Sequence, residues 1–368
     1  MNIEGGAGGA SNAPSDEGRT CRYCGNHVDP LDQFCEGCGS ELRVRRGCTA
    51  DHVGNGVPAS CRGCGHDLAD HDAVDHGDQF CPECGALRGD GTDHVEIDLG
   101  TLAGVSDRGR LHARNEDAMA LGERSATADV PGAVAAVVCD GVSSVDRPEL
   151  ASRAATRAAL GALLSPRGAG TSARTHVEAA VAAAAEAVAA LPYDAGRGAP
   201  SCTLVAALVE GAAPEMTVAW VGDSRAYWLC PPGQAGATSA QSSLLTTDHS
   251  WAAEMVALGE LDEATAAADP RAHAITRWLG ADSSDTPSVV ELRPDGPGLL
   301  LLCSDGLWNY LPDASALAGA AYATGVGPHD VAAELTRYAL DCGGHDNITV
   351  VAIPIAEPIR TNGTLVRT

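Results

Sequence analysis

Apolar residues from about Ile97 onward fall into short runs separated by Gly, Pro and Asp, with alanine-rich stretches between them. The run at 299–303 has no polar alternation and therefore predicts a strand covered on both faces. Buried strands are predicted on these grounds over 133–139, 203–209, 217–221, 225–230, 299–303 and 348–353. Helical period and propensity predict helices over 149–164, 174–191, 250–259 and 329–341. Because several strand links are too short for a crossover helix, the pattern predicts an α+β fold of antiparallel layers flanked by helices.

The chain before residue 97 differs in composition and has few apolar runs. Residues 1–20 are rich in Gly, Ala and Ser and are expected to be disordered. Residues 21–93 contain nine of the 14 cysteines and hardly any apolar run. We therefore place a domain boundary near 93–98, and we expect the last residues, 357–368, to form a flexible tail.

Eight of those cysteines form four Cys-x2-Cys pairs, namely Cys21 with Cys24, Cys35 with Cys38, Cys61 with Cys64, and Cys81 with Cys84. Each such turn presents two thiolates to one side of an ion, and Zn²⁺ takes four tetrahedral ligands. The pairs predict a double zinc ribbon over 21–93 that holds two structural zinc ions. Disulfides, or a redox dithiol that would not need four pairs, are the alternative interpretations. Residues His66, His71 and His76 could compete as ligands, and Cys48 is left over.

The charge balance excludes several classes of protein. All 24 basic residues are arginine, which removes the P-loop NTPases, the protein kinases and the Schiff-base enzymes, whose chemistry needs a lysine amine. The net charge of −25 would repel a phosphate backbone, so no nucleic-acid partner is expected. Residues 1–97 alone carry 17 acids against seven arginines, and only salt-sensitive binding by that fragment would revive such a role. With neither a signal peptide nor an apolar membrane span in view, we expect a cytoplasmic protein that does not contact a membrane.

Acidic residues gather where the apolar runs begin or end. Asp140, Asp223 and Asp305 follow apolar runs, and Asp346 precedes the run at 348–353. A single Asp-Gly is most simply a turn, but several at strand ends can meet at one edge of an antiparallel sheet. With Glu116 and Asp117 added, up to six acids could converge. Such a cluster requires cations, because neighbouring carboxylates oppose each other's ionisation.

The chemistry of this cluster favours hard metal ions. A set of oxygen ligands without histidine points to Mg²⁺ or Mn²⁺. Two such ions about 3.5–4 Å apart would activate a water and clamp a phosphoryl oxygen. A cysteine phosphatase is excluded, because no cysteine has arginine six positions on, and no Gly-x-Ser-x-Gly elbow occurs. The cysteines inside apolar runs are most simply core residues: Cys139, Cys202, Cys230 and Cys303.

At this point the sequence resembles the metal-dependent PPM-type protein serine/threonine phosphatases, also called protein phosphatase 2C. The resemblance covers about 98–356. It rests on ordered motifs that begin at Arg114-Asn115-Glu116-Asp117, Cys139-Asp140-Gly141, Ser201-Cys202-Thr203-Leu204, Gly222-Asp223-Ser224-Arg225, Thr247-Asp248-His249-Ser250, Ile275-Thr276-Arg277, Cys303-Ser304-Asp305-Gly306 and His345-Asp346-Asn347-Ile348. The resemblance implies a four-layer α-β-β-α sandwich of two antiparallel sheets, preceded here by the zinc ribbons.

The resemblance also implies a role for each acid. Asp140 would bridge two Mn²⁺ or Mg²⁺ ions, the Gly141 carbonyl would bind one of them, and Asp305 and Asp346 would hold the other. Glu116 and Asp117 would orient waters around the ions. Asp223 with Asp305 could hold the third ion of bacterial members. Water would then attack phosphoserine or phosphothreonine in line, without a phosphoenzyme.

Two positions depart from the family pattern. The phosphate-gripping arginine is replaced by His112, so Arg110, Arg114 or a protonated His112 is expected to take over that role. The usual glycine pair after Asp140-Gly141 is replaced by Ser143-Ser144. The segment 248–270 matches the family's variable flap, where substrate choice could be set.

The leading hypothesis is therefore a phosphoprotein phosphatase whose zinc ribbons serve docking or regulation and could bind a protein partner of their own. The alternative is a weakly active binding module that senses phosphoproteins and recruits partners through the ribbons. Only the altered position at His112 supports that alternative.

Overall fold

The computed structural model describes residues 44–52, 83, 91–127, 130–168, 170–194, 196–211, 215–232, 241–283, 286–323, 325 and 327–356. Apart from Val44, these residues belong to the compact unit formed by 45–368. The eight cysteines of the predicted zinc ribbons, the predicted disordered segment 1–20 and the predicted tail 357–368 lie outside the described residues.

The first sheet has the strand order β1-β4-β5-β7-β8-β12. Its strands are β1 (Val44–Cys48), β4 (Ala118–Arg124), β5 (Ala133–Cys139), β7 (Leu204–Glu210), β8 (Glu215–Val221) and β12 (Ser288–Leu292). The pairings from β4 through β12 are antiparallel. β5 and β7 lie inside the sheet and are almost wholly buried, as the continuous apolar runs predict.

The second sheet has the order β10-β9-β13-β14-β3-β2. Its strands are β2 (His94–Asp98), β3 (Ala103–Asp107), β9 (Arg225–Leu229), β10 (Ser243–Leu244), β13 (Gly298–Cys303) and β14 (Ile348–Ile355). All of its pairings are antiparallel. A separate two-stranded ladder joins β6 (Ser201–Cys202) to β11 (Leu279–Gly280).

The main core lies between the two sheets. Alternate residues of β13 face opposite ways: Leu300 and Leu302 join Val138 and Val205 of the first sheet in one apolar cluster. Leu301 and Cys303 instead pack in a second cluster with the helices outside the second sheet. This two-residue period explains why the run needs no polar position, since both faces of the strand are covered.

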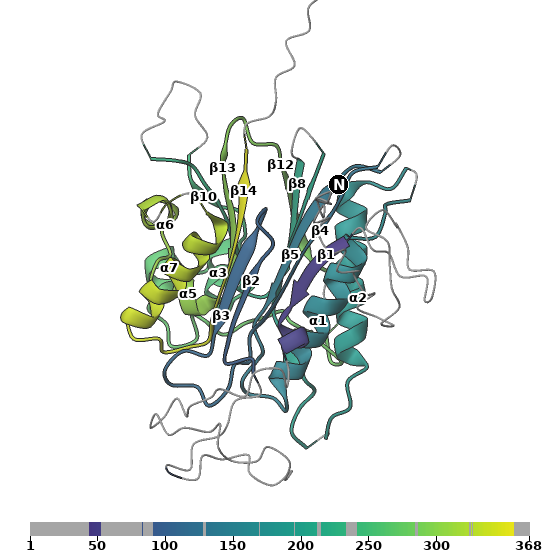
Figure 1. The fold of residues 1–368 in the computed structure, drawn as a ribbon. Coiled ribbons are helices and arrows are strands. Elements are labelled where there is room, and N and C mark those ends of the chain that lie inside the picture. Colours follow the sequence, from purple (N-terminus) through teal and green to yellow (C-terminus); the bar gives the residue numbers. More distant parts are fainter. Residues whose placement is uncertain are drawn as a thin grey trace, which may run out of the picture. The chain divides into compact units, whose positions relative to one another are not determined.

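Helices cover the outer face of each sheet (Figure 1). α1 (Pro148–Leu163) and α2 (Ala173–Ala189) pack on the first sheet. α5 (Asp305–Trp308), α6 (Ala314–Ala323) and α7 (Pro328–Asp341) pack on the second. α3 (Trp251–Ala257) and α4 (Glu263–Ala267) contact each other in the segment between β10 and β11. The predicted four-layer arrangement is confirmed.

The elements predicted from the sequence are present with end shifts of a few residues. Several other elements were not predicted, among them the buried strands β3 and β4 and the shorter or more exposed elements β2, β6, β10, β11, β12, α4, α5 and α6. β1 with the following 3-10 helix η1 (Thr49–His52) was also not expected, because it lies between two cysteine pairs in the segment assigned to the ribbons. Among the described helices, none is long and apolar enough to cross a membrane.

Candidate active site

Strand register brings five aspartates to one edge of the sandwich. In the first sheet Ala118 pairs with Cys139, so Asp117 and Asp140 leave the same end of β4 and β5. In the second sheet Cys303 pairs with both Arg225 and Val350. Asp223, Asp305 and Asp346 lie within a few residues of these positions and at the same end of β9, β13 and β14. After burial, the charges of Asp117, Asp305, Asp223 and Asp346 raise the pKa of Asp140, as expected for acids that lie close together.

Asp117 is the most tightly held of these acids. Its side chain is buried, and Oδ2 accepts hydrogen bonds from Ser304 Oγ at 2.7 Å and Thr349 Oγ1 at 2.8 Å. Oδ1 is buried without a hydrogen-bond partner. Burial raises the pKa of Asp117 to about 8, against the effect of the two hydroxyl donors, and the charges of Asp346 and Asp305 raise it further. The Oδ2 atom of Asp117 is therefore held by two hydrogen bonds, and its Oδ1 atom can accept a further ligand.

Asp305 and Asp140 form the second part of the cluster. Asp305 begins α5; its Oδ2 accepts a 3.2 Å hydrogen bond from Asn309 Nδ2, and its buried Oδ1 has no hydrogen-bond partner. Burial and the charges of Asp346 and Asp223 raise the pKa of Asp305 to about 7. Burial raises the pKa of Asp140 as well, and the charge of Asp117 is the next cause. Burial and neighbouring charges thus disfavour the ionised form of both carboxyls, and a bound cation would offset this effect.

Asp223 is held by the segment that follows β8. Its side chain is buried, and burial followed by the charge of Asp248 raises its pKa to about 7. Its backbone carbonyl accepts a 3.0 Å hydrogen bond from Trp308 Nε1. The Arg225 guanidinium lies 3.7 Å from the centre of the Trp308 ring. Trp308 therefore connects Asp223 to α5, which begins at Asp305.

The loop after Asp140 is tightly packed around Gly141. A Cβ there would lie 2.8 Å from the carbonyl oxygen of Glu116 and 2.9 Å from the backbone of Pro148, so only glycine fits. Ser143, at one of the departures from the family pattern, donates a 2.5 Å hydrogen bond to Glu116 Oε2. The Glu116 N–H in turn donates to Asn347 Oδ1 at 2.8 Å. Glu116 is thus fixed at both its main chain and its side chain.

The residues considered for binding phosphate have different surroundings. His112 Nε2 lies 3.1 Å from Asp346 Oδ1, which places this histidine at the acidic edge. Arg114 pairs with Glu149 at 3.2 Å and keeps a half-exposed side chain. Arg110 donates to the carbonyl oxygen of Leu340, at the end of α7. Of these three residues, His112 contacts an acid of the cluster, whereas Arg114 contacts α1 and Arg110 contacts the end of α7.

A buried polar chain behind the site was missed as a functional feature. Asn115 Nδ2 donates to Ser106 Oγ at 2.9 Å, and Ser106 Oγ lies 2.8 Å from Thr349 Oγ1. Thr349 and Ser304 then reach Asp117. Ser304 and Asn115 stand inside the quoted motifs and Thr349 directly follows one of them, so their position next to the acids was the available signal.

The acids suit hard cations by their donor chemistry. Two buried carboxylate oxygens without partners, on Asp117 and Asp305, are acceptors that an ion would satisfy. In the part of the chain that the structure describes, no three His, Cys, Asp or Glu side chains already form a metal shell.

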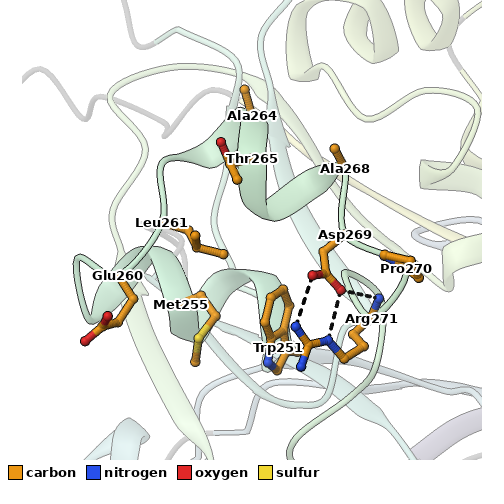
Figure 2. A pocket seen from close by; sticks show the side chains of 10 residues that line it. All are labelled: Trp251, Met255, Glu260, Leu261, Ala264, Thr265, Ala268, Asp269, Pro270 and Arg271. Carbon is orange, nitrogen blue, oxygen red and sulfur yellow. Dashed lines mark hydrogen bonds and ion pairs between the residues drawn. The ribbon is translucent and has the colours of Figure 1, made fainter.

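The predicted flap contains a groove between α3 and α4. Its volume is about 910 Å³, and Figure 2 shows Trp251 and Met255 on one side with Leu261 and Ala264 opposite. Arg271 stacks on Trp251 at 4.1 Å and pairs with Asp269 at 2.9 Å. The flap joins the acidic edge through Asp248, which receives two hydrogen bonds from Arg225.

Comparison with known proteins gives concordant matches. A family model described as protein phosphatase 2C matches residues 108–338. The serine/threonine phosphatase stp of Listeria innocua is 35% identical over 112 residues, which are 30% of this chain and 40% of that protein. Protein phosphatase PhpP of Streptococcus pneumoniae is 31% identical over 113 residues, or 31% of this chain and 45% of that protein. The chain thus spans less than half the length of these curated relatives.

Solved structures match over a larger share. The serine/threonine phosphatase PstP/Ppp of Mycobacterium tuberculosis superposes with a TM-score of 0.56 at 27% identity, covering 70% of this chain and 98% of that one. A PstP catalytic domain in complex with two manganese ions gives a TM-score of 0.53 at 26% identity, covering 69% and 97%.

Proposed function

This chain belongs to the protein phosphatase 2C family, and we propose that it is a metal-dependent phosphatase that hydrolyses phosphoserine and phosphothreonine in proteins. The observation that carries the proposal is the convergence of five buried or half-buried aspartates, two of which keep a buried oxygen without a partner. The names of the relatives agree with this activity.

The residues that would hold Mn²⁺ or Mg²⁺ are Asp117, Asp140, the Gly141 carbonyl, Asp223, Asp305 and Asp346. When bound, two such ions lower the pKa of a water and neutralise charge on the phosphoryl group. A relative solved with two manganese ions supports this choice of metal.

The chain's own residues supply orientation and charge. Ser304 and Thr349 fix Asp117, so its remaining oxygen points to one position. Ser143 and Asn347 fix Glu116, which would accept a proton or a hydrogen bond from water. His112 in its protonated form and the half-exposed Arg114 would bind the phosphoryl oxygens in place of the family's arginine.

The direct test is phosphate release from a phosphothreonine peptide in the presence of Mn²⁺. We expect turnover that chelation abolishes and that Asp305→Asn reduces by at least about a hundredfold, because the buried Oδ1 of Asp305 has no hydrogen-bond partner and is a proposed metal ligand. Asp295→Asn, at an exposed turn, is the matched control and should retain full activity. Turnover that survives both chelation and Asp305→Asn would refute the proposal.

For the cysteine pairs outside the described residues, we propose two zinc ions that fold a docking or regulatory ribbon. Elemental analysis of protein purified without chelators should give two zinc ions per chain. Protein that contains no zinc would overturn this assignment.

A further inference from the structure

A short segment ahead of the family match completes the first sheet. β1 lies next to β4 at the sheet's edge, and η1 follows it directly. Figure 1 shows this pair in purple beside β4 and α1. The family model begins only at residue 108, so these residues are an addition to the matched part of the chain. We call residues 45–52 the N-terminal strap.

Thr49 makes the most specific contact of the strap. Its side chain is fully buried, and its hydroxyl both donates to the Met119 carbonyl at 3.2 Å and accepts from the Met119 N–H at 3.0 Å. One hydroxyl thus satisfies both backbone groups of a β4 residue, as a neighbouring strand would. Met119 is two residues after Asp117, at the start of the same strand.

Three further contacts hold the strap in place. A Cβ on Gly47 would lie 2.5 Å from Ile97 Cγ2, so the strap backbone packs directly on β2. Cys48 is buried and interacts with Thr156 of α1. Asp51 pairs with Arg157 of α1 at 3.2 Å. The cysteine left over from the pairs is therefore a packing residue between the strap and α1.

We propose that Thr49 is a positioning residue for the metal edge, acting through Met119 on Asp117. The inference rests on the proposed function. Asp117 is held from the second sheet by Ser304 and Thr349, and the strap holds β4 from the edge of the first sheet. Removing the Thr49 hydroxyl would leave the buried Met119 N–H and carbonyl without their partner, and the start of β4 would shift or loosen.

The test compares Thr49→Val, which keeps the shape without the hydroxyl, with Thr49→Ser, which keeps the hydroxyl. We expect Thr49→Val to weaken Mn²⁺ binding in calorimetry, and to raise the Mn²⁺ concentration for half-maximal turnover, by on the order of tenfold. Thr49→Ser should stay within about twofold of the natural protein. Thr101→Val is the matched control, because Thr101 bonds Glu123 at the far end of β4 and is exposed. It should leave Mn²⁺ binding unchanged.

A measurement on the unaltered protein covers the case in which Thr49→Val does not fold. The Met119 amide should exchange its hydrogen as slowly as that of Val137 in the interior strand β5, since Thr49 protects it. A Met119 amide that exchanges quickly would overturn the proposal. So would a Thr49→Val protein that is less stable but binds Mn²⁺ as the natural protein does. If Mn²⁺ binds but no phosphoester is turned over, the proposed function fails while the calorimetric comparison still decides the role of Thr49.

Discussion

Arg225 holds Asp248 with two parallel hydrogen bonds, from Nε at 3.0 Å and from Nη2 at 2.7 Å. Both side chains are only 14% exposed, and the guanidinium also stacks on Trp308. Asp248 begins the flap, and Trp308 binds the backbone of Asp223. The pair therefore connects the flap to the acidic edge.

Arg225→Lys should weaken this connection, because lysine can make neither the two-pronged bond nor the planar stack. We expect the free energy of unfolding to fall by about 2 kcal/mol, the scale of a hydrogen bond to a charged group. Urea unfolding measures it. Arg293→Lys, at a surface pair with Glu215, is the control and should change stability little. Equal losses in the two variants would contradict the assigned role.

Ser304→Ala should shift the pH dependence of turnover. The Ser304 hydroxyl favours the ionised form of Asp117, so its loss raises that carboxyl's pKa further. The acid limb of the pH–rate profile is therefore expected to move to higher pH. Thr349→Ser keeps the second hydroxyl and should leave the limb in place. If the acid limb stays unchanged in Ser304→Ala, the ionisation of Asp117 does not set that limb.

Removal of the metal should destabilise the fold more at high pH than at low pH. Carboxyls whose folded pKa values are raised stabilise the fold below their unfolded values near 4, and this contribution is lost as pH rises through the folded values. For Asp223, Asp305 and Asp117 these are about 7, 7 and 8. The difference in Tm between Mn²⁺ and chelator should thus be larger at pH 8 than at pH 6. A difference that shrinks over that range would contradict the acidic cluster as the binding site.

His94 should make the stability of the fold depend on pH, because its side chain is paired with a carboxylate. Its Nδ1 lies 2.6 Å from Asp107 Oδ2, and this hydrogen bond raises the pKa of His94. A raised histidine pKa stabilises the fold fully below the unfolded value near 6.5, and the contribution is lost as pH rises through the folded value. The loss of stability on His94→Gln should therefore be larger at pH 6 than at pH 8.5 in urea unfolding. The exposed variant Arg293→Gln should show no such dependence.

The groove in the flap should affect protein substrates more than small ones. Trp251→Ala removes the largest apolar side chain of the groove. Five acids over 251–271 stand against the single Arg271, which favours substrates with basic and apolar residues. We expect KM for a basic phosphopeptide to rise about threefold to tenfold with an unchanged kcat for an aryl phosphate. Equal effects on both substrates would place Trp251 in a structural role only.

The sequence could predict the strands that are apolar on both faces, because a short continuous apolar run such as 299–303 is stable mainly when both of its faces are buried. It could also predict the aspartates at their ends, since register follows from antiparallel pairing. It could not predict β1, because this strand depends on contacts with residues that are distant in the sequence. Gly47 packs on Ile97, and Thr49 binds Met119. The local sequence pattern likewise could not predict the partners of His112 and Ser143, because both contacts join loops that follow different strands.

The hydrogen bonds on Asp117 cross from one sheet to the other. Asp117 enters β4 of the first sheet, whereas Ser304 follows β13 and Thr349 lies in β14 of the second. Neither half of the sandwich contains a complete set of acids and the hydroxyls that orient them. The centre therefore forms only when the two sheets pack against each other in the correct position, so Mn²⁺ binding would report on the packing between the sheets.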